Sequence, residues 1–418
     1  VRTMASTNRS LPGILLIIPS LLWSGNLLVA QEAPLAGGSS MPAATLLRSA
    51  RVFDGHSAQL HEGWAVLVEG ERISGVGPES SLAVPRDAEV VDLPGLTLLP
   101  GLIEGHAHLL LHPYDETPWT DQVLLESLGE RTARGVVHAG RSLMAGITTL
   151  RDLGTEGAGF ADIGLKAAIE KGVIPGPRLI VTGRAIVATG SYNPKGAPEW
   201  DLPKGAEEAD GYDDLVRVTR DQIGRGADWV KIYADYRWGP HGTAQPTFTE
   251  AELRTVVEVA ESSGRRVVAH ATNSESIRRS VEAGIKTIEH GDGGDREAFR
   301  LMADRGVALC PTLGAGEAYA MYGGWEKGVD PEPVRVTGKK ESFRLALEEG
   351  VPMCFGGDVG VFDHGDNVWE LELMVEYGMP ALYALRSATS VNAEIFGLDD
   401  RLGEIREGYL ADIIAVEG

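Results

Sequence analysis

The stretch RVVAHATNSESIRRSVEAGIKTIEH, residues 266–290, decides the fold. It begins with an apolar run at 266–271, which is typical of a buried strand. A helical pattern follows at 274–283 and stops at Gly284, a residue that helices favour directly after their last turn. A second apolar run ends on His290. A strand, a helix and another strand in this order predict a parallel sheet.

The same alternation extends over most of the chain. Helical patterns separate most of the apolar runs, and several of them stop at a glycine. Repeated strand–helix units predict an α/β fold, the (β/α)8 TIM barrel, whose catalytic groups lie at the C-terminal ends of the strands. The eight apolar runs lie at 97–102, 147–152, 178–182, 229–234, 266–271, 287–290, 307–313 and 351–356.

Short β-like runs flank this region on both sides. Those at 46–54, 63–69 and 71–77 precede it, and one at 410–416 follows it. They predict a small β-sandwich domain built from both termini, comprising residues 46–96 and 400–418. The catalytic barrel is then expected to occupy residues 97–399.

The first thirty residues predict a signal peptide. Arg2 and Arg9 are the only charges before Glu32, and an apolar run follows at 11–22. A retained membrane anchor is the alternative, but this run is shorter than the ~20 residues that a span needs. We therefore expect export to the periplasm or the extracellular space after removal of residues 1–30. Residues 31–45 would form a flexible tail, and no stable membrane anchor is expected.

Composition excludes several classes of protein. The chain has 38 Lys+Arg against 60 Asp+Glu, a formal net charge of −22, which argues against nucleic-acid partners and anionic membrane surfaces. Hydrophobic residues make up 43% of the chain, which excludes a disordered acidic protein. The two cysteines, Cys310 and Cys354, are expected to be buried thiols in the seventh and eighth strands rather than a disulfide.

Four histidines and one aspartate follow the predicted strands. His106 and His108 come after the first strand, and residues two apart in an extended segment point the same way. His270 and His290 end the fifth and sixth strands, and Asp358 follows the eighth. Because the barrel gathers these strand ends on one face, the five side chains predict a metal site.

Lys231 adds a sixth group to this set. It lies within the apolar strand Trp229-Val230-Lys231-Ile232-Tyr233. Burying an unpaired ammonium is costly, so a lysine in this position requires a functional role.

Four motifs resemble signatures of the amidohydrolase superfamily, over roughly residues 46–416. They are PGLIEGHAH at 100–108, GITTLRDLG at 146–154, ATSVNA at 388–393 and LGEIREGYLADII at 402–414. Glu104 stands where the first motif usually has an aspartate. The resemblance is greatest to imidazolonepropionase-like and prolidase-like hydrolases, among which exported members cleave dipeptides or N-acyl amino acids, including ochratoxin-type amides.

The resemblance implies two Zn²⁺ ions per subunit. His106, His108 and Asp358 would hold one ion, and His270 and His290 the other. Lys231 would carry a CO2-derived carbamate that bridges the two ions, which gives the buried lysine a role. The residues expected to act in catalysis are Asp358 as proton carrier, with Lys231 and His290. By the same resemblance we expect a homo-oligomer, with an octamer as one form.

The substrate is expected to be a small-molecule amide or a peptide. A leaving amino acid presents a carboxylate, which an arginine or a tyrosine can bind. Tyr233 and Arg237 follow Lys231, and Arg184 follows the third strand, so these three are the candidate substrate contacts. The alternative for each arginine is a surface ion pair. Aromatic residues on two long loops would wall the pocket or pack between subunits: Tyr192, Trp200, Tyr319, Tyr322 and Trp325.

Together these features predict an exported binuclear zinc hydrolase that cleaves an amide bond to a C-terminal amino acid. Its substrates would be dipeptides or N-acyl and N-aroyl amino acids, ochratoxin-type amides among them. One alternative is hydrolysis of a cyclic amide, a lactone or a phosphotriester at the same metals. Another is a non-catalytic binding protein on a barrel scaffold.

Overall fold

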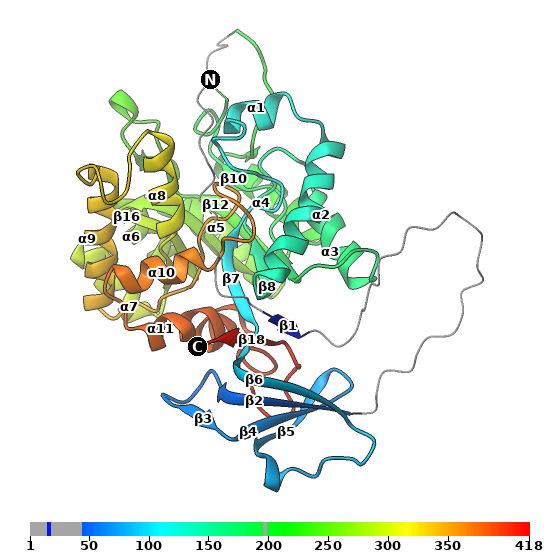
Figure 1. The fold of residues 1–418 in the computed structure, drawn as a ribbon. Helices are drawn as coiled ribbons and strands as arrows, with labels where there is room; N and C mark the ends of the chain where they lie inside the picture. Colours follow the sequence, from blue (N-terminus) through cyan, green and yellow to red (C-terminus); the bar gives the residue numbers. More distant parts are fainter. Residues whose placement is uncertain (1–14, 18–43, 195–198) are drawn as a thin grey trace, which may run out of the picture. The chain divides into compact units, whose positions relative to one another are not determined.

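The computed structural model describes residues 15–17, 44–194 and 199–418 and divides the chain into two compact units (Figure 1). Of the described residues, unit 1 comprises those up to Gly101 together with Leu398–Gly418, and unit 2 comprises those within Leu102–Gly397. The predicted domain boundaries at 96/97 and 399/400 lie close to these divisions. The predicted signal peptide and tail lie outside the described residues, except for residues 15–17 and 44–45.

Unit 1 is one β-sheet made from both ends of the chain. The C-terminal strand β18 pairs antiparallel with β6, with Ile413 opposite Pro100. Hydrogen bonds join all the strands in the order β1-β18-β6-β2-β4-β5, with β3 paired to β2, so a sandwich of two separate sheets is not confirmed. The strands are β1 (Leu15–Ile17), β2 (Thr45–Phe53), β3 (Leu60–Glu62), β4 (Trp64–Glu69), β5 (Arg72–Pro78), β6 (Glu89–Pro100) and β18 (Ile413–Glu417).

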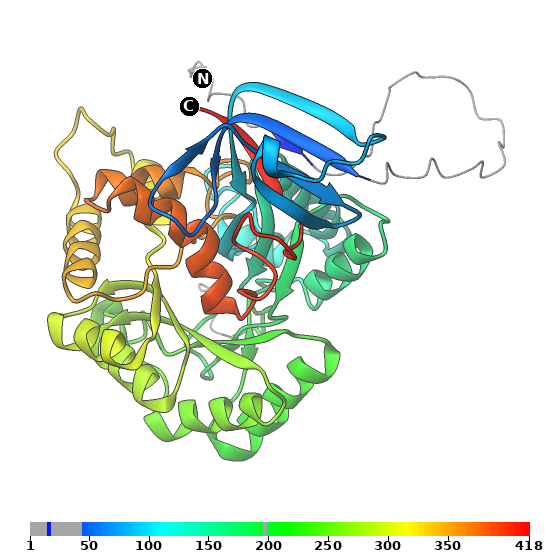
Figure 2. The same ribbon diagram turned by 90° about the horizontal axis from the view of Figure 1, so that it is seen from below.

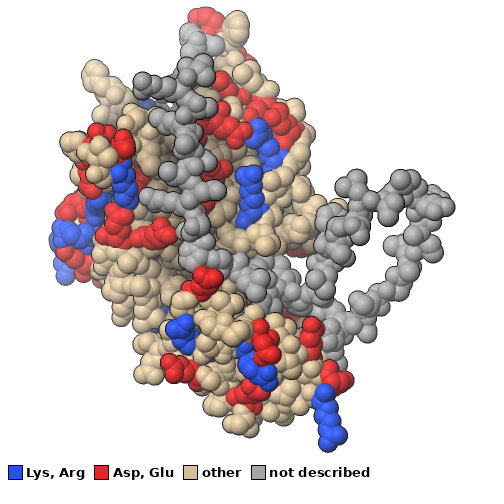
Figure 3. All heavy atoms as spheres, in the orientation of Figure 1, with Lys and Arg blue, Asp and Glu red and all other residues tan. Residues whose placement is uncertain are grey.

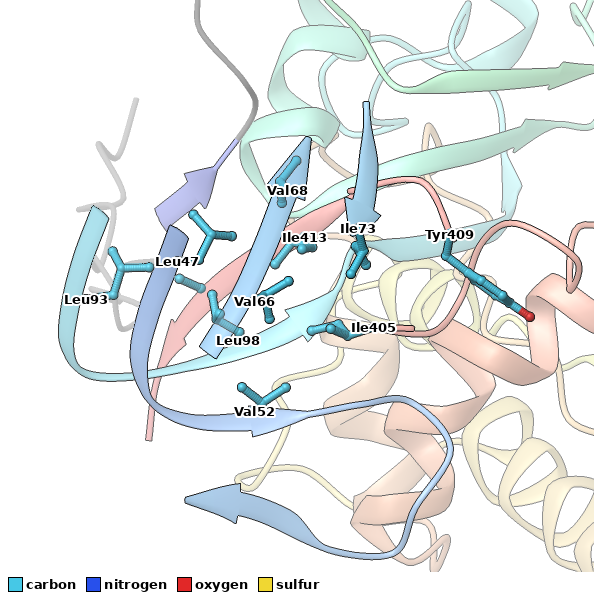
Figure 4. Close-up of a cluster of buried hydrophobic side chains, with 11 residues drawn as sticks. Leu47, Val52, Val66, Val68, Ile73, Leu93, Leu98, Ile405, Tyr409 and Ile413 are labelled. Atoms are coloured by element: carbon cyan, nitrogen blue, oxygen red, sulfur yellow. The ribbon is translucent and has the colours of Figure 1, made fainter. Parts of the chain in front are cut away.

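The core of unit 1 follows the two-residue period of its strands. Figure 4 shows Val66 and Val68 of β4 in one apolar cluster together with Leu98 and Ile413. The intervening Leu67 belongs to a second cluster with other neighbours. Successive side chains of β4 therefore point to opposite faces of the sheet, and both faces are buried at this strand.

Unit 2 has the α/β architecture of the TIM-barrel type, with parallel strands and intervening helices. One parallel sheet joins β7 (Leu102–Ala107), β8 (Ile147–Asp152) and β9 (Arg178–Val181). A second has the order β11-β10-β12-β15-β16-β17, and its pairs are also parallel. Its strands are β10 (Ile186–Val187), β11 (Glu207–Glu208), β12 (Trp229–Tyr233), β15 (Arg266–Asn273), β16 (Thr287–Gly293) and β17 (Ala308–Cys310).

The predicted eighth strand is the least regular part of unit 2. The segment 351–359 forms only two isolated parallel bridges, Leu309 with Met353 and Ala107 with Val359. The Cys354 N–H donates to the Leu309 carbonyl at 2.8 Å, and the Gly105 N–H donates to that of Phe355 at 2.8 Å. This segment therefore connects β17 to β7 without forming a continuous strand. Its pair of glycines, Gly356 and Gly357, disfavours extended pairing.

Helices lie on the outer side of the strands in the green and yellow-green part of Figure 2. The α6 helix shows why they begin and end where they do, since the Asn273 side chain accepts from the Ser276 N–H and Gly284 follows with a φ of 98°. The helices are α1 (Trp119–Leu124), α2 (Leu128–Met144), α3 (Ala161–Glu170), α4 (Gly211–Arg225), α5 (Glu250–Glu261), α6 (Ser274–Ala283), α7 (Arg296–Arg305), α8 (Leu313–Tyr322), α9 (Val334–Glu348), α10 (Trp369–Glu376), α11 (Ala381–Arg386) and α12 (Asn392–Phe396).

The two cysteines are paired, so the prediction of two free thiols is wrong. Cys310 at the end of β17 forms a disulfide with Cys354, and their Cα atoms lie 4.5 Å apart. The sequence places them on consecutive strands but does not give the register. The bridge between Leu309 and Met353 puts the next residue of each segment side by side.

The surface carries charges of both signs. Acidic and basic side chains are interspersed on the face shown in Figure 3. Several form ion pairs, for example Arg296 with Glu348 at 2.8 Å and Arg217 with Asp214 at 2.7 Å. Of the helices in the described part of the chain, none has both the length and the apolar character that a membrane span requires.

Candidate metal centre

Three of the predicted ligands form one cluster. The ligand atoms of His106, His108 and Asp358 all lie within 4.8 Å of one another. Asp358 Oδ1 is 3.3 Å from Nε2 of His108 and 3.5 Å from Nε2 of His106. The Asp358 N–H donates to the His106 carbonyl at 2.8 Å, and its backbone is left-handed with a φ of 62°. The backbone thus fixes this carboxylate against both imidazoles.

The other two histidines lie beside this cluster. His270 on β15 and His290 on the adjacent β16 have ring centroids 4.4 Å apart. The ring of His290 also lies 5.2 Å from that of His106. The structure therefore brings together all four histidines that the sequence analysis singled out.

Lys231 completes the set from β12. The residue is 1% exposed, and its Nζ has no hydrogen-bond partner. Burial lowers the pKa of Lys231 to about 8. A buried amine without a partner, whose charge acts on the imidazoles of His106, His270 and His290, fits a group that becomes an anion on reaction with CO2 and then binds cations. The donor set of four histidines, one aspartate and this lysine thus suits two Zn²⁺ ions.

Buried hydrogen bonds orient the ligand histidines. Nδ1 of His106 lies 2.7 Å from Oε2 of Glu289, and Nδ1 of His108 lies 2.8 Å from the Gly154 carbonyl oxygen. Nδ1 of His290 lies 2.8 Å from the Thr312 hydroxyl. When Nδ1 carries the proton, the lone pair of Nε2 is free to bind a metal.

Electrostatics divides the histidines into two groups. Burial lowers the pKa values of His106, His270 and His290 well below the ordinary value, so these rings are neutral, as metal binding requires. Burial acts the same way on His108, but the neighbouring carboxylate of Asp358 outweighs it and raises the pKa of His108 to about 9. His108 and Asp358 therefore form an ion pair in the absence of a cation.

Glu104, the departure from the resembled motif, has a structural role. Its Oε1 accepts hydrogen bonds from the N–H groups of His106 and Gly357, each at 3.0 Å. Its Oε2 accepts from the Asn367 side chain at 3.1 Å. Burial raises the pKa of Glu104 to about 8. The carboxyl group links β7 to the loop that carries Asp358.

The centre opens into a cavity of about 480 Å³. Tyr233 and Arg237 both line it, as the sequence analysis proposed for substrate contacts. Arg184 does not, because it lies in a separate cavity and pairs with Glu207. For Arg184 the structure therefore supports the alternative of an ion pair.

Of the aromatic residues predicted on the two long loops, some line the cavity and others do not. Tyr192 and Tyr319 line the cavity, whereas Trp200 is 75% exposed. Tyr322 donates to the Val361 carbonyl, and Trp325 is buried. Neither lies among the residues that line the cavity.

Several cavity residues were missed by the sequence analysis. Glu156 is buried and follows the second strand. Its position after a strand could have identified it from the sequence, because residues after the strands of a barrel line the catalytic face. Arg335 and Lys339 lie on α9, far in sequence from any strand end, so only packing reveals them. Lys339 donates to Asp292 and to the Thr312 hydroxyl that contacts His290.

Comparison with known proteins gives consistent matches. The model of the Amidohydrolase family matches residues 97–418. Ochratoxinase of Aspergillus niger is 31% identical over 350 residues, which covers 77% of this chain and 70% of that protein. A solved Xaa-Pro dipeptidase with methionine bound in its active site has a TM-score of 0.80 and 32% identity, over 90% of this chain and 94% of that one. A solved prolidase in complex with N-methylphosphonate-L-proline has a TM-score of 0.78 and 29% identity, over 90% and 93%.

Proposed function

Because this chain belongs to the amidohydrolase family and acts on amide bonds, we propose that it is an exported zinc hydrolase that releases a C-terminal amino acid. The bond cleaved would join that amino acid to an acyl or aminoacyl group. The relatives named ochratoxinase and Xaa-Pro dipeptidase support this substrate class. We also propose that the protein forms a homo-oligomer, in which each subunit has a complete eight-strand barrel and a β-rich domain.

The observation that carries the proposal is the position of guanidinium groups beside the ligand cluster. Arg237 and Arg335 line the same cavity as the four histidines. Neither arginine forms an ion pair within residues 44–194 and 199–418, and Arg335 instead lies 5.1 Å from the centroid of the Tyr319 ring. Exposed arginines without an anionic partner inside a cavity suit a substrate carboxylate.

The six ligand residues supply the reaction centre. Bound at these side chains and at a carbamate on Lys231, two Zn²⁺ ions would provide Lewis acidity and a water of lowered pKa. The pKa of Asp358 is lowered despite its burial, because His106 and His108 stabilise its charge. Asp358 is therefore a carboxylate that accepts the proton of the attacking water at Oδ1 and passes it to the leaving amine. Arg237 holds the carboxylate of the departing amino acid.

A substrate panel tests this function. Purified protein is loaded with zinc and assayed on dipeptides, N-acyl amino acids, lactones and phosphotriesters, with release of the amino acid as the readout. We expect the amides of free amino acids to give the highest kcat/KM. Higher kcat/KM for lactones or phosphotriesters would favour the alternative hydrolase, and fewer than one zinc per chain without any turnover would favour a binding protein.

A further inference from the structure

We propose that Glu156 and the tyrosines around it bind the α-ammonium group of the substrate, so that the enzyme acts on dipeptides with a free N-terminus. This inference rests on the proposed amidase function and narrows its substrate class. We call Glu156, Tyr192, Tyr233 and Tyr236 the Glu156 subsite. All four residues line the cavity of the metal centre.

Neutral donors hold the Glu156 carboxylate in place. Oε2 accepts hydrogen bonds from the Tyr192 hydroxyl at 2.5 Å and from Trp119 Nε1 at 2.9 Å. Oε1 accepts one from the Tyr233 hydroxyl at 3.2 Å. Burial raises the pKa values of both tyrosines well above the ordinary value, and the charge of Glu156 adds to this, so the hydroxyls remain donors. A carboxylate offers about four acceptor positions, so one on Oε1 remains for a ligand.

The Glu156 carboxylate interacts with the charges of Arg131, His108 and Lys231 only at longer range than an ion pair. Glu156 is 2% exposed, and within the described ranges no lysine or arginine forms an ion pair with it. The nearby Arg131 instead donates to the backbone carbonyls of Leu110, Thr155 and Glu156. Burial of an unpaired anion is expensive, and a cationic ligand would offset that cost.

The walls of the Glu156 subsite also suit an organic cation. The ring centroids of Tyr192 and Tyr233 lie 4.8 Å apart, and those of Tyr192 and Tyr236 also lie 4.8 Å apart. The faces of tyrosine rings attract ammonium groups. The carboxylate, which these aromatic rings surround, favours a positively charged amine over a neutral acyl group.

The Glu156 subsite lies close to the centre of reaction. A Cβ atom added at Gly154 would lie 3.6 Å from Oε1 of Glu156 and 3.8 Å from Cε1 of His108. The α-ammonium of a dipeptide is two bonds from its scissile carbonyl carbon, so it must lie near the metal ligands. A cationic side chain several bonds further out fits this distance less well. We therefore assign the Glu156 subsite to the α-ammonium.

The backbone at Glu156 is fixed in an unusual conformation. Its φ is 48°, in the left-handed region that few residues other than glycine adopt. Arg131, itself 2% exposed, holds this turn through the carbonyls of Thr155 and Glu156. Such conformations persist where the surrounding structure stabilises them, and they are concentrated at functional sites. With Arg237 and Arg335 lining the same cavity, the pocket offers Glu156 to the ammonium group and two guanidinium groups to the carboxylate of a zwitterionic dipeptide.

The test compares two substrates that differ only in the ammonium group. Alanyl-phenylalanine and N-propionyl-phenylalanine have the same acyl shape, and only the first carries a positive charge. We measure kcat/KM for both with the zinc-loaded wild type, with Glu156→Gln and with the control Glu258→Gln. Glu258 is exposed on α5, so this variant makes the same charge change away from the cavity.

We expect the wild type and E258Q to prefer alanyl-phenylalanine by roughly 30-fold, and E156Q to lose most of that preference, since a hydrogen bond to a charged group is at stake. A wild-type preference for the propionyl substrate would overturn the inference, and this readout does not require E156Q to fold. Equal loss of both substrates in E156Q would also overturn it, and would indicate a role in shaping the metal centre.

Equilibrium binding separates this inference from the proposed function. Calorimetry with metal-free protein measures the affinity of the same two compounds without turnover. If neither compound is hydrolysed but alanyl-phenylalanine binds more tightly and E156Q removes the difference, the Glu156 subsite is supported and the proposed release of a C-terminal amino acid is refuted. If both compounds are hydrolysed and the E156Q change does not alter the preference between them, the proposed function is supported and the Glu156 subsite is refuted. If neither hydrolysis nor ammonium-dependent binding is observed, the proposed function and the Glu156 subsite are both refuted.

Discussion

Oε2 of Glu289 lies 2.7 Å from Nδ1 of His106, and the other oxygen of the same carboxylate lies 2.9 Å from Nη2 of Arg151. Both Glu289 and Arg151 have fully buried side chains. The Thr287 hydroxyl donates to the same Oε1 at 2.7 Å. One buried carboxylate of unit 2 thus orients a predicted metal ligand and neutralises an arginine.

Glu289→Gln is expected to weaken zinc binding and lower stability together. Loss of the anion that orients a ligand histidine costs about 10- to 100-fold in metal affinity. The buried Arg151 would also lose its counter-charge, which costs about 3 kcal/mol of unfolding free energy. Competition with a zinc chelator and urea unfolding measure the two effects. Glu297→Gln, an exposed position on α7, is the matched control, and unchanged zinc affinity in E289Q would contradict the orienting role.

Lys231→Ala is expected to lower activity roughly a thousandfold or more, because the proposed carbamate that would help to hold the Zn²⁺ ions is lost. Zinc content should fall below two ions per chain. Short carboxylic acids such as propionate should partly restore turnover, since their carboxylate can take the place of the carbamate. Lys171→Ala on the surface serves as control. Full activity of K231A without an added acid would refute the bridging role.

Arg237→Gln is expected to raise KM for substrates with a free C-terminal carboxylate by about 10- to 30-fold, since one charge-assisted hydrogen bond is lost. The comparison is alanyl-phenylalanine against its C-terminal amide. The wild type should prefer the acid, and R237Q should lose most of that preference. Arg300→Gln, exposed on α7, controls for the change in charge. Retention of the full preference in R237Q would assign carboxylate binding to another residue.

His138 is expected to make the protein less stable in mild acid. Its ring stacks on that of His364 at 4.4 Å, and burial lowers its pKa to about 4. As the pH falls from 6.5 toward 4, the unfolded chain binds a proton at this residue and the folded protein does not, so stability falls. At pH 5 the loss is about 2 kcal/mol relative to pH 7.

Urea unfolding of the wild type and His138→Asn at pH 7 and pH 5 checks this value. Asparagine retains a donor for the Leu109 carbonyl, which lies 2.8 Å from Nδ1 of His138, but it does not titrate. The variant should therefore lose about 2 kcal/mol less than the wild type on acidification. An equal fall in unfolding free energy in the two proteins would show that His138 does not contribute to the loss of stability in acid.

The disulfide is expected to contribute about 4 kcal/mol to the unfolding free energy, because it closes a loop of 44 residues in the unfolded chain. Cys310→Ala with Cys354→Ala should lower the stability by about this amount. Thiol titration in denaturant gives an independent check on the wild type. Reaction of two thiols before any reductant is added would contradict the pairing.

The proposed ligands could be predicted from the sequence because of one topological rule. His106, His270, His290 and Asp358 each follow an apolar run, and parallel strands bring their C-terminal ends to one face. Lys231 was recognisable because a charged residue inside an apolar strand needs a partner or a function. Strand periodicity and strand order therefore sufficed to predict that these side chains come together.

Other features depended on contacts between distant segments. The register of β17 against the segment around Met353 pairs the cysteines, and no local pattern encodes that register. The joining of the C-terminal strand to the sheet of unit 1 likewise depends on pairing between β6 and β18.

The sequence by itself determined which residues meet at the metal centre, because local periodicity sets the strands and chain order sets their parallel arrangement. Only the tertiary structure decided what surrounds them. Glu289 contacts His106, Lys339 contacts Thr312, and Glu156 accepts a hydrogen bond from Tyr192. In each pair the partner comes from another segment of the chain. Hydrogen bonding and the cost of burying charge depend on distances in space, and separation along the chain does not specify those distances.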